Sequence, residues 1–223
     1  MMKIIDLTHQ ISESMPMYPG TGAPKLHVAY NHDDHGFKET LISLYSHTGT
    51  HIDAPAHLYA DGTTLDKYPI EQFVGKALVV DCRVLEKGEK IPLSLIKEKG
   101  DILKEAEFIF FLTGYDKLWG NLDYFNDFPV LSDEAVEWIN RSKLKGIGID
   151  APSFDPVTIN ELEQASDDLH NHRAILITNN TILLENLCKL EDIGNDLFTL
   201  CTLPLNVIEA DGAPARVIAL VNF

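Results

Sequence analysis

The residues with the clearest capacity for chemistry lie between positions 46 and 57, where the sequence reads SHTGTHIDAPAH. This stretch holds three of the nine histidines of the chain, together with one aspartate. Gly49, Pro55 and the β-branched residues between them disfavour a helix. In an extended backbone the odd-numbered residues share one face, so the sequence predicts one face bearing His47, His51, Asp53 and His57.

A shared metal ion explains this face best. Four residues of straight strand advance about 13 Å, too far for two imidazoles to bind one ion comfortably. We therefore predict a bend between His47 and His51, at Gly49. Nitrogen and carboxylate ligands without thiolate suit zinc, manganese or iron better than calcium. A hydrogen-bonded polar turn without a metal is the alternative.

The same residues predict catalysis as well as binding. Three protein ligands, His47, His51 and Asp53, leave a coordination position for water, as catalytic metal sites do. A divalent ion lowers the pKa of bound water and makes it a nucleophile near neutral pH. His57 lies just beyond these ligands, and an imidazole with a pKa near 6.5 can transfer protons there.

The middle of the chain alternates between strand and helix patterns. Apolar, β-branched runs at 77–84, 107–113 and 145–152 predict buried strands. A short helix is expected at 92–99, ending before Gly100, and a longer one at 133–143, capped by Ser132. The order strand, helix, strand, helix, strand predicts a parallel β-α-β-α-β core.

The flanks of the chain predict further strands, at 181–187, 197–205 and 215–223, and a mostly extended N-terminal third. No linker or repeat divides the sequence. We therefore expect a single α/β domain over residues 1–223, with mixed β-sheets around the parallel core and helices to one side.

The composition of the chain limits the kinds of molecule and compartment that suit the protein. The net charge of −16 disfavours nucleic acids and anionic membranes. The three cysteines, Cys82, Cys188 and Cys201, are widely spaced, and we expect all of them to be buried and unpaired in a reducing compartment. No signal-peptide pattern begins the sequence, and no apolar run approaches the roughly 20 residues of a membrane span. A soluble, cytoplasmic protein acting on a small molecule is expected.

The stretch 47–57 resembles the H-x-G-T-H-x-D-x-P-x-H signature of the cyclase family of metal-dependent hydrolases, matching every fixed position. This family includes bacterial kynurenine formamidase, an arylformamidase of tryptophan catabolism, and isatin hydrolase. The resemblance continues in IIDLTHQIS and MPMYPG near the start and in four later blocks: 112–119, 128–139, 148–155 and 172–187. It implies a swivelling β/β/α cyclase-like fold and a homodimer or homotetramer.

The resemblance also implies roles for individual residues. His47 and His51 would bind a first divalent ion, Asp53 would bridge it to a second, and His57 would donate and accept the proton. His172 and Glu185 would complete the second site, with Glu185 touching both ions. Zinc is the expected metal and manganese the alternative. Tyr18 would contact the substrate ring, although a core tyrosine is nearly as consistent with the sequence.

One departure from the family pattern concerns the distal ligands. The interval from His172 to Glu185 is one residue longer than the family pattern leads us to expect, and we place the extra residue in the turn at 178–180. His170 is the alternative ligand. From the residues alone, His172 would be a solvated helix edge and Glu185 a salt-bridged strand residue.

Several other polar residues are predicted to have local roles. Asp150 and Asp155 flank a turn at Pro152 and are interpreted mainly as turn caps. Thr48 and Thr50 are expected to stabilise their turn. The histidines outside the site are expected to be ordinary; these are His9, His27, His32 and His35.

The function that follows is hydrolysis of an amide or formamide bond by two metal ions, with an N-formylkynurenine-type arylformamide as the leading substrate. Three alternatives stay open: hydrolysis of an isatin-type cyclic amide, a ring-closing cyclase or lyase, and non-catalytic metal binding.

Overall fold

The computed structural model describes residues 2–157, 168–177 and 181–222. At its centre is an eight-stranded sheet in the order β1-β12-β11-β5-β7-β9-β10-β4. β12 also pairs with β4, so the sheet curls into a barrel-like core. The strands of this sheet are β1 (Met2–Asp6), β4 (His51–Asp53), β5 (Val74–Asp81), β7 (Phe108–Leu112), β9 (Gly146–Ile149), β10 (Ile182–Glu185), β11 (Phe198–Pro204) and β12 (Gly212–Asn222).

The sheet is mixed, which confirms the predicted α/β class. β5, β7, β9 and β10 pair in parallel, and the remaining pairs are antiparallel. The connections are more elaborate than single helices. β6 (Lys90–Ile91) precedes α2 (Leu93–Lys97), and β8 (Val130–Leu131) precedes α3 (Asp133–Arg141). The swivelling β/β/α arrangement and the single domain over 1–223 stay predictions.

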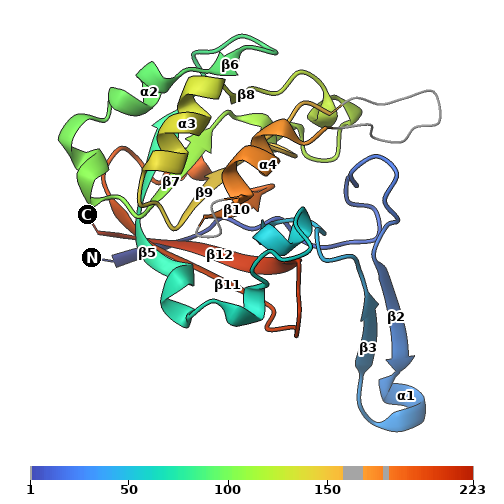
Figure 1. Cartoon of the computed structure of the whole chain (residues 1–223). Helices are drawn as coiled ribbons and strands as arrows, with labels where there is room; N and C mark the ends of the chain where they lie inside the picture. Colours follow the sequence, from blue (N-terminus) through green and yellow to red (C-terminus); the bar gives the residue numbers. More distant parts are fainter. Residues whose placement is uncertain (1, 158–167, 178–180, 223) are drawn as a thin grey trace.

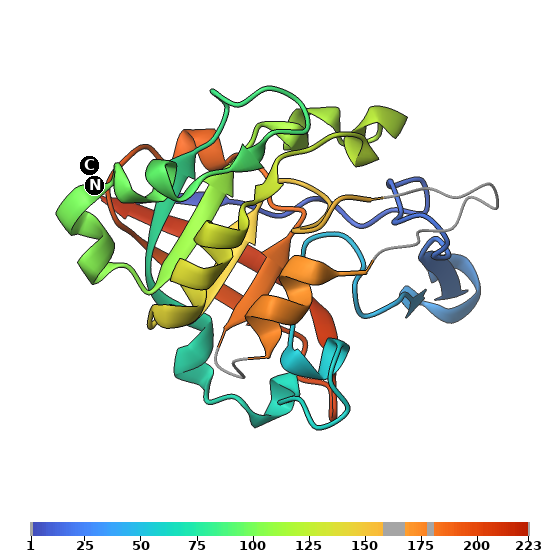
Figure 2. The same cartoon turned by 45° about the horizontal axis from the view of Figure 1, so that its top comes forward.

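The central strands are apolar on both faces because both faces are buried. In β7, Phe108 and Phe110 pack into the cluster inside the curled sheet, whereas Ile109 and Phe111 pack into a second cluster beneath the helices. Alternate side chains of a strand point to opposite faces, so a run such as FIFFL can fill two layers. Figures 1 and 2 show α3 and α4 (His170–Leu176) side by side on one face of the sheet.

β9 carries glycines where β7 carries phenylalanines. Gly146 is the register partner of Phe108, and Gly148 that of Phe110. A Cβ added at Gly148 would lie 2.6 Å from Cδ1 of Phe110 and 2.7 Å from Cδ1 of Leu187. The missing side chains of β9 therefore give the aromatic rings of β7 their space.

The two predicted helices form with small differences. Ser132 caps α3, and its hydroxyl accepts a hydrogen bond from the Ala135 amide at 3.3 Å. The expected stop at Gly100 is wrong in detail. α2 ends at Lys97, and after it Gly100, with φ of 61°, begins a 3-10 helix, Gly100–Glu105.

A long hairpin projects from the body of the protein (Figure 1). It consists of β2 (Lys25–Tyr30) and β3 (Glu39–Ser43), joined through α1 (His32–His35). Its surface is unusually apolar, with Leu41 61% and Ile42 59% exposed. The predicted extended character of the N-terminal third is therefore present, with a four-residue helix at the hairpin tip.

All three cysteines are free. Cys82 and Cys188 are buried as expected, but Cys201 is only half-buried, because alternate residues of β11 face away from the core. None of the helices within the described ranges is long and apolar enough to cross a bilayer.

Candidate metal centre

β4 lies between β10 and β12 and brings three segments of the chain together. Its pairing places Glu185 directly opposite His51 on one side and Gly212 opposite Asp53 on the other. Ile52 between them packs into the core. Since neighbouring side chains of a strand alternate, His51 and Asp53 point to the other face, toward the helices.

The predicted bend before β4 is present. Gly49 has φ of 65°, a left-handed conformation that favours glycine, and a side chain there would press on Met15. The prediction of a continuous extended run is wrong beyond Asp53, because Pro55 begins a 3-10 helix, Pro55–His57. Proline suits the first position of such a turn, since its ring fixes φ and its missing N–H needs no partner.

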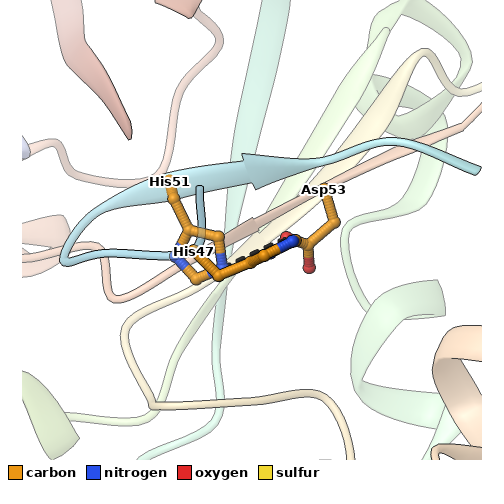
Figure 3. A group of neighbouring side chains, drawn as sticks. All are labelled: His47, His51 and Asp53. Carbon is orange, nitrogen blue, oxygen red and sulfur yellow. Dashed lines mark hydrogen bonds and ion pairs between the residues drawn. The ribbon is translucent and has the colours of Figure 1, made fainter. Parts of the chain in front are cut away.

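The first group of candidate ligands comprises His47, His51 and Asp53 (Figure 3). Nδ1 of His47 lies 2.5 Å from Oδ1 of Asp53, and Nε2 of His51 lies 3.1 Å from the same oxygen. The bend at Gly49 thus brings the two imidazoles toward one carboxylate oxygen, as the spacing predicted.

The second group comprises Asp53, His172 and Glu185. Nε2 of His172 lies 3.0 Å from Oε1 of Glu185 and 3.5 Å from Oδ2 of Asp53. Nε2 of His51 lies 3.5 Å from Oε2 of Glu185. Asp53 therefore takes part in both groups, and Glu185 also approaches the first.

His172 comes from the first turn of α4 and is buried, not a solvated helix edge. His170, the alternative ligand, lies outside both groups: its side chain is 65% exposed, and its Nε2 lies 4.0 Å from Oδ1 of Asp133. The turn at 178–180, where we placed the extra residue, falls outside the described residues.

His57 lies beside these groups rather than within them. Its ring centroid is 4.0 Å from that of His47 and 6.4 Å from that of His172. Burial lowers the pKa of His57, the largest effect on this group. The neutral ring is therefore able to accept a proton near pH 7.

Each candidate imidazole ligand has a hydrogen-bond acceptor on its other nitrogen. Nδ1 of His51 lies 2.8 Å from the Gly49 carbonyl, Nδ1 of His172 lies 2.6 Å from Oδ2 of Asp155, and Nε2 of His47 lies 2.8 Å from Oδ2 of Asp211. Such acceptors fix the orientation of metal-binding histidines.

Two of these acceptors were not predicted. Asp155 was interpreted as a turn cap; it does accept the amides of Asn171 and His172, at 2.7 and 3.0 Å, but it also holds the His172 ring. Asp211 was missed, because it lies in the polar EADGAP stretch, and only the pairing of β12 with β4 brings it to His47. Asp150 was expected to cap the turn at Pro152, but it accepts instead from the amides of Thr113 and Gly114, which follow β7.

In this site, charge interactions shift the pKa values of the ligands in the direction opposite to that of burial. Burial would raise the pKa of Asp53, but the charges of His51 and His47 lower it well below its ordinary value. Burial would lower the pKa of His47, yet Asp53 and Asp211 raise it to about 10. For His172, burial is likewise overcome, chiefly by Glu185, and the pKa is raised well above its ordinary value. The buried carboxylates thus strongly attract positive charge.

This donor set fits divalent metal ions. In each group the candidate ligand atoms all lie within 4.8 Å of one another. The donors are imidazole nitrogens and carboxylate oxygens without sulfur, a combination that suits zinc and manganese. Asp53 is 1% and Glu185 5% exposed, and carboxylates so deeply buried stay charged only where positive charge or hydrogen-bond donors compensate them, as the neighbouring histidines do and a divalent ion would.

A cavity of about 360 Å³ opens over the centre, and both ligand groups and His57 line it. Its remaining walls are largely apolar and aromatic, formed by Pro16, Met17, Tyr18, Trp119, Phe125 and Pro152, among others. Tyr18, predicted to contact substrate, is thus placed in the wall. Of the described residues that line the cavity, none is a lysine or an arginine.

Comparison with known proteins found a family model and relatives that match most of the chain. A family model described as a putative cyclase matches residues 5–156. Kynurenine formamidase of Salinibacter ruber is 29% identical over 223 residues, covering 97% of this chain and 97% of that protein.

Solved structures are similar over the whole chain. Isatin hydrolase A from Labrenzia aggregata, bound to benzyl benzoate, superposes with a TM-score of 0.84 at 24% identity, covering 100% of this chain and 94% of that one. A predicted metal-dependent hydrolase from Bacillus stearothermophilus superposes with a TM-score of 0.74 at 25% identity, covering 100% of both chains.

Proposed function

This chain belongs to the cyclase family, and from that premise we propose that it is a metal-dependent hydrolase cleaving the amide or formamide bond of an arylamine. N-formylkynurenine-type arylformamides are the leading substrates, in line with the kynurenine formamidases it is similar to. One observation supports the proposal above all. Buried imidazoles and carboxylates from three distant segments meet in the wall of a largely apolar cavity.

Two divalent ions, zinc or alternatively manganese, are the proposed cofactors. His47, His51 and Asp53 would hold the first, and Asp53, His172 and Glu185 the second. Bound there, divalent ions would supply a water of lowered pKa and polarise the substrate carbonyl. The near contact of Glu185 with His51, at 3.5 Å, supports a carboxylate shared between the two positions.

His57 is the proposed proton carrier. Its ring lies beside His47 and lines the cavity, and its lowered pKa keeps it unprotonated near pH 7. It would take a proton from the attacking water and return it to the departing nitrogen. An arylamine anion is a poor leaving group, so this second transfer is needed for the bond to break.

The aromatic wall supports an aryl substrate. Trp119, Phe125 and Tyr18 present ring surfaces in the cavity that also contains the ligands. Aromatic groups bury large apolar areas and prefer stacked or edge-to-face contacts. The proposed substrate would place its ring against this wall and its amide carbonyl beside the ligands.

A second candidate is hydrolysis of an isatin-type cyclic amide. The absence of lysine and arginine from the described lining residues favours it, because a compact neutral lactam needs no cationic partner, whereas the amino-acid arm of N-formylkynurenine carries a carboxylate. The fold shared with isatin hydrolase A agrees with this candidate.

A short series of measurements tests the proposal. Protein purified without added metal is analysed for bound elements, then assayed with N-formylkynurenine, formanilide and isatin. We expect two equivalents of a transition metal and hydrolysis that a chelator abolishes. Free formate identifies the formamidase, and a ring-opened acid the lactam hydrolase. A ring-closed product identifies a cyclase, and metal without turnover of any compound points to non-catalytic binding.

We also propose a homodimer or homotetramer in the cytoplasm. The exposed apolar residues of the β2–β3 hairpin support association, and three free cysteines suit a reducing compartment.

A further inference from the structure

Two residues lie against the His47 ring: Asp211, at the end of the loop before β12, and Gly212, the first residue of β12. We propose that Asp211 and Gly212 commit His47 to binding metal through Nδ1, which makes this segment a positioning component of the first metal site. The inference rests on the metal-binding part of the proposed function and adds two residues from the C-terminal part of the chain.

The two ring nitrogens of His47 face different carboxylates. Nδ1 lies 2.5 Å from Oδ1 of Asp53, on the side of the other ligands, and Nε2 lies 2.8 Å from Oδ2 of Asp211. A carboxylate accepts but cannot donate, so Asp211 requires a proton on Nε2. Asp53 faces Nδ1 in the same way, so a metal ion bound on that side would displace the proton on Nδ1 and leave the one on Nε2 in place.

Gly212 leaves the space that the His47 ring occupies. A Cβ added there would lie 2.6 Å from Cε1 and 3.0 Å from Nε2 of His47, and 2.8 Å from the backbone oxygen of Ile52. Real Cβ atoms do not approach other atoms so closely, so the ring occupies space that only glycine leaves open. Glycine is therefore needed at position 212 to make room for the His47 ring, and not to form a turn.

Pairing between β12 and β4 fixes the positions of Asp211 and Gly212 relative to the ligands. Gly212 is the register partner of Asp53, and the Asp211 carbonyl accepts the Ala54 amide at 2.9 Å. The Ser46 hydroxyl lies 3.4 Å from Oδ2 of Asp211 and can donate to it. Asp211 is thus bonded to the backbone of Ala54 on one side of the ligands and to the side chain of Ser46 on the other, which gives its carboxylate a defined position.

His57 is a weaker partner of the same carboxylate. Its Nδ1 lies 3.7 Å from Oδ2 of Asp211, beyond hydrogen-bond distance. The bond to His47 is therefore the one that places Asp211 in the site. Asp155 provides a natural comparison, because it makes the corresponding bond to His172 in the second ligand group.

The test compares these two carboxylates by metal binding. Zinc affinity of both sites is measured by competition with a colorimetric chelator, for wild type, Asp211→Asn, Asp155→Asn and Asp101→Asn. We expect Asp211→Asn to weaken one site by roughly 10- to 100-fold and Asp155→Asn to weaken the other by a similar factor. Asp101→Asn removes a 93% exposed carboxylate paired with Lys104 and should change neither.

A second variant separates proton placement from charge. Asp211→Asn and Asp211→Ala remove the same charge, but the Asn amide can donate to Nε2 and so stabilise the ring with its proton on Nδ1, where it blocks the metal. The Asp211 side chain is 44% exposed, so water replaces it in Asp211→Ala. We therefore expect the Asn variant to bind zinc more weakly than the Ala variant.

Two results would overturn the inference: unchanged affinity of both sites in Asp211→Asn, or an Ala variant that binds as weakly as the Asn variant. Because the readout is metal affinity, it stands whether or not any substrate is hydrolysed. A protein that binds two zinc ions but hydrolyses nothing would contradict the proposed reaction and leave this inference intact.

Discussion

Some residues of the site can be predicted from a short stretch of sequence, whereas others reach the site only through the fold. His47, His51 and Asp53 could be predicted because four potential ligands on one parity surround a glycine within eleven residues. His172 and Glu185 followed from family resemblance alone, since neither has a distinctive local pattern. Asp155 and Asp211 belong to residue types that are common in turns, and their partners lie far away in sequence. Their roles required three-dimensional pairing.

The proposed proton carrier gives the first prediction. His57→Ala should lower kcat by roughly 10²–10⁴, because removing a general acid and base costs about that factor. Metal content should be unchanged, since His57 is not among the proposed ligands. His170→Ala, which removes an exposed histidine outside the site, serves as the matched control and should keep full activity. Full turnover by metal-loaded His57→Ala would exclude this role.

His9 gives a prediction about pH. Its ring stacks on Trp119 with centroids 3.9 Å apart, and burial, with a smaller effect of the Lys189 charge, lowers the pKa of His9 to about 4. The unfolded chain, with a histidine pKa near 6.5, then binds the proton more readily. The neutral ring therefore favours folding fully above pH 6.5, and this contribution is lost as the pH falls toward 4.

Denaturant titrations of wild type and His9→Gln at several pH values measure this effect. Between about pH 7 and pH 4.5 the free energy of unfolding of wild type should fall by about 2 kcal/mol more than that of the variant. The difference between the two proteins removes the contribution of the other acid-sensitive groups. Parallel pH profiles would show that His9 does not titrate as described.

At the scale of elements, the strands were easier to predict than their ends. The apolar runs of β5, β7 and β9 and the capped helix α3 have strong local signals. The start of β12 had none: its first residues, Gly212 to Pro214, contain no β-branched residue and join the sheet by pairing with β4. The 3-10 helices at Pro55–His57 and Gly100–Glu105 were not predicted either, because such short turns leave little periodic pattern in the sequence.

The glycines of β9 give a prediction at this scale. Gly148→Ala should destabilise the protein by about 1–3 kcal/mol, because the added Cβ would overlap the Phe110 ring and Leu187. Chemical denaturation measures the loss. In the double variant Gly148→Ala with Phe110→Leu the two costs should be less than additive, since the smaller side chain relieves the overlap. Strict additivity would show that crowding by Phe110 is not the cause.

For the whole molecule, the metal centre should act as a stabilising link. Saturating zinc or manganese, at roughly 1,000 times its dissociation constant, should raise the free energy of unfolding by about 4 kcal/mol per independent site over the chelated protein. Thermal melts with chelator and with restored metal measure the change. Asp53→Ala, which removes the carboxylate common to both groups, should melt at the same temperature in either condition. A chelator effect that persisted in this variant would place the stabilising metal elsewhere.

The closure of the sheet by β4 also bears on synthesis of the protein. β4 is hydrogen-bonded to β10 on one edge and to β12 on the other, so its final position depends on residues 182–185 and 212–214. While the ribosome is still making the latter segment, His47, His51 and Asp53 have already emerged but lack their neighbours. Ion uptake should therefore follow translation, and nascent chains arrested before position 212 should retain zinc poorly.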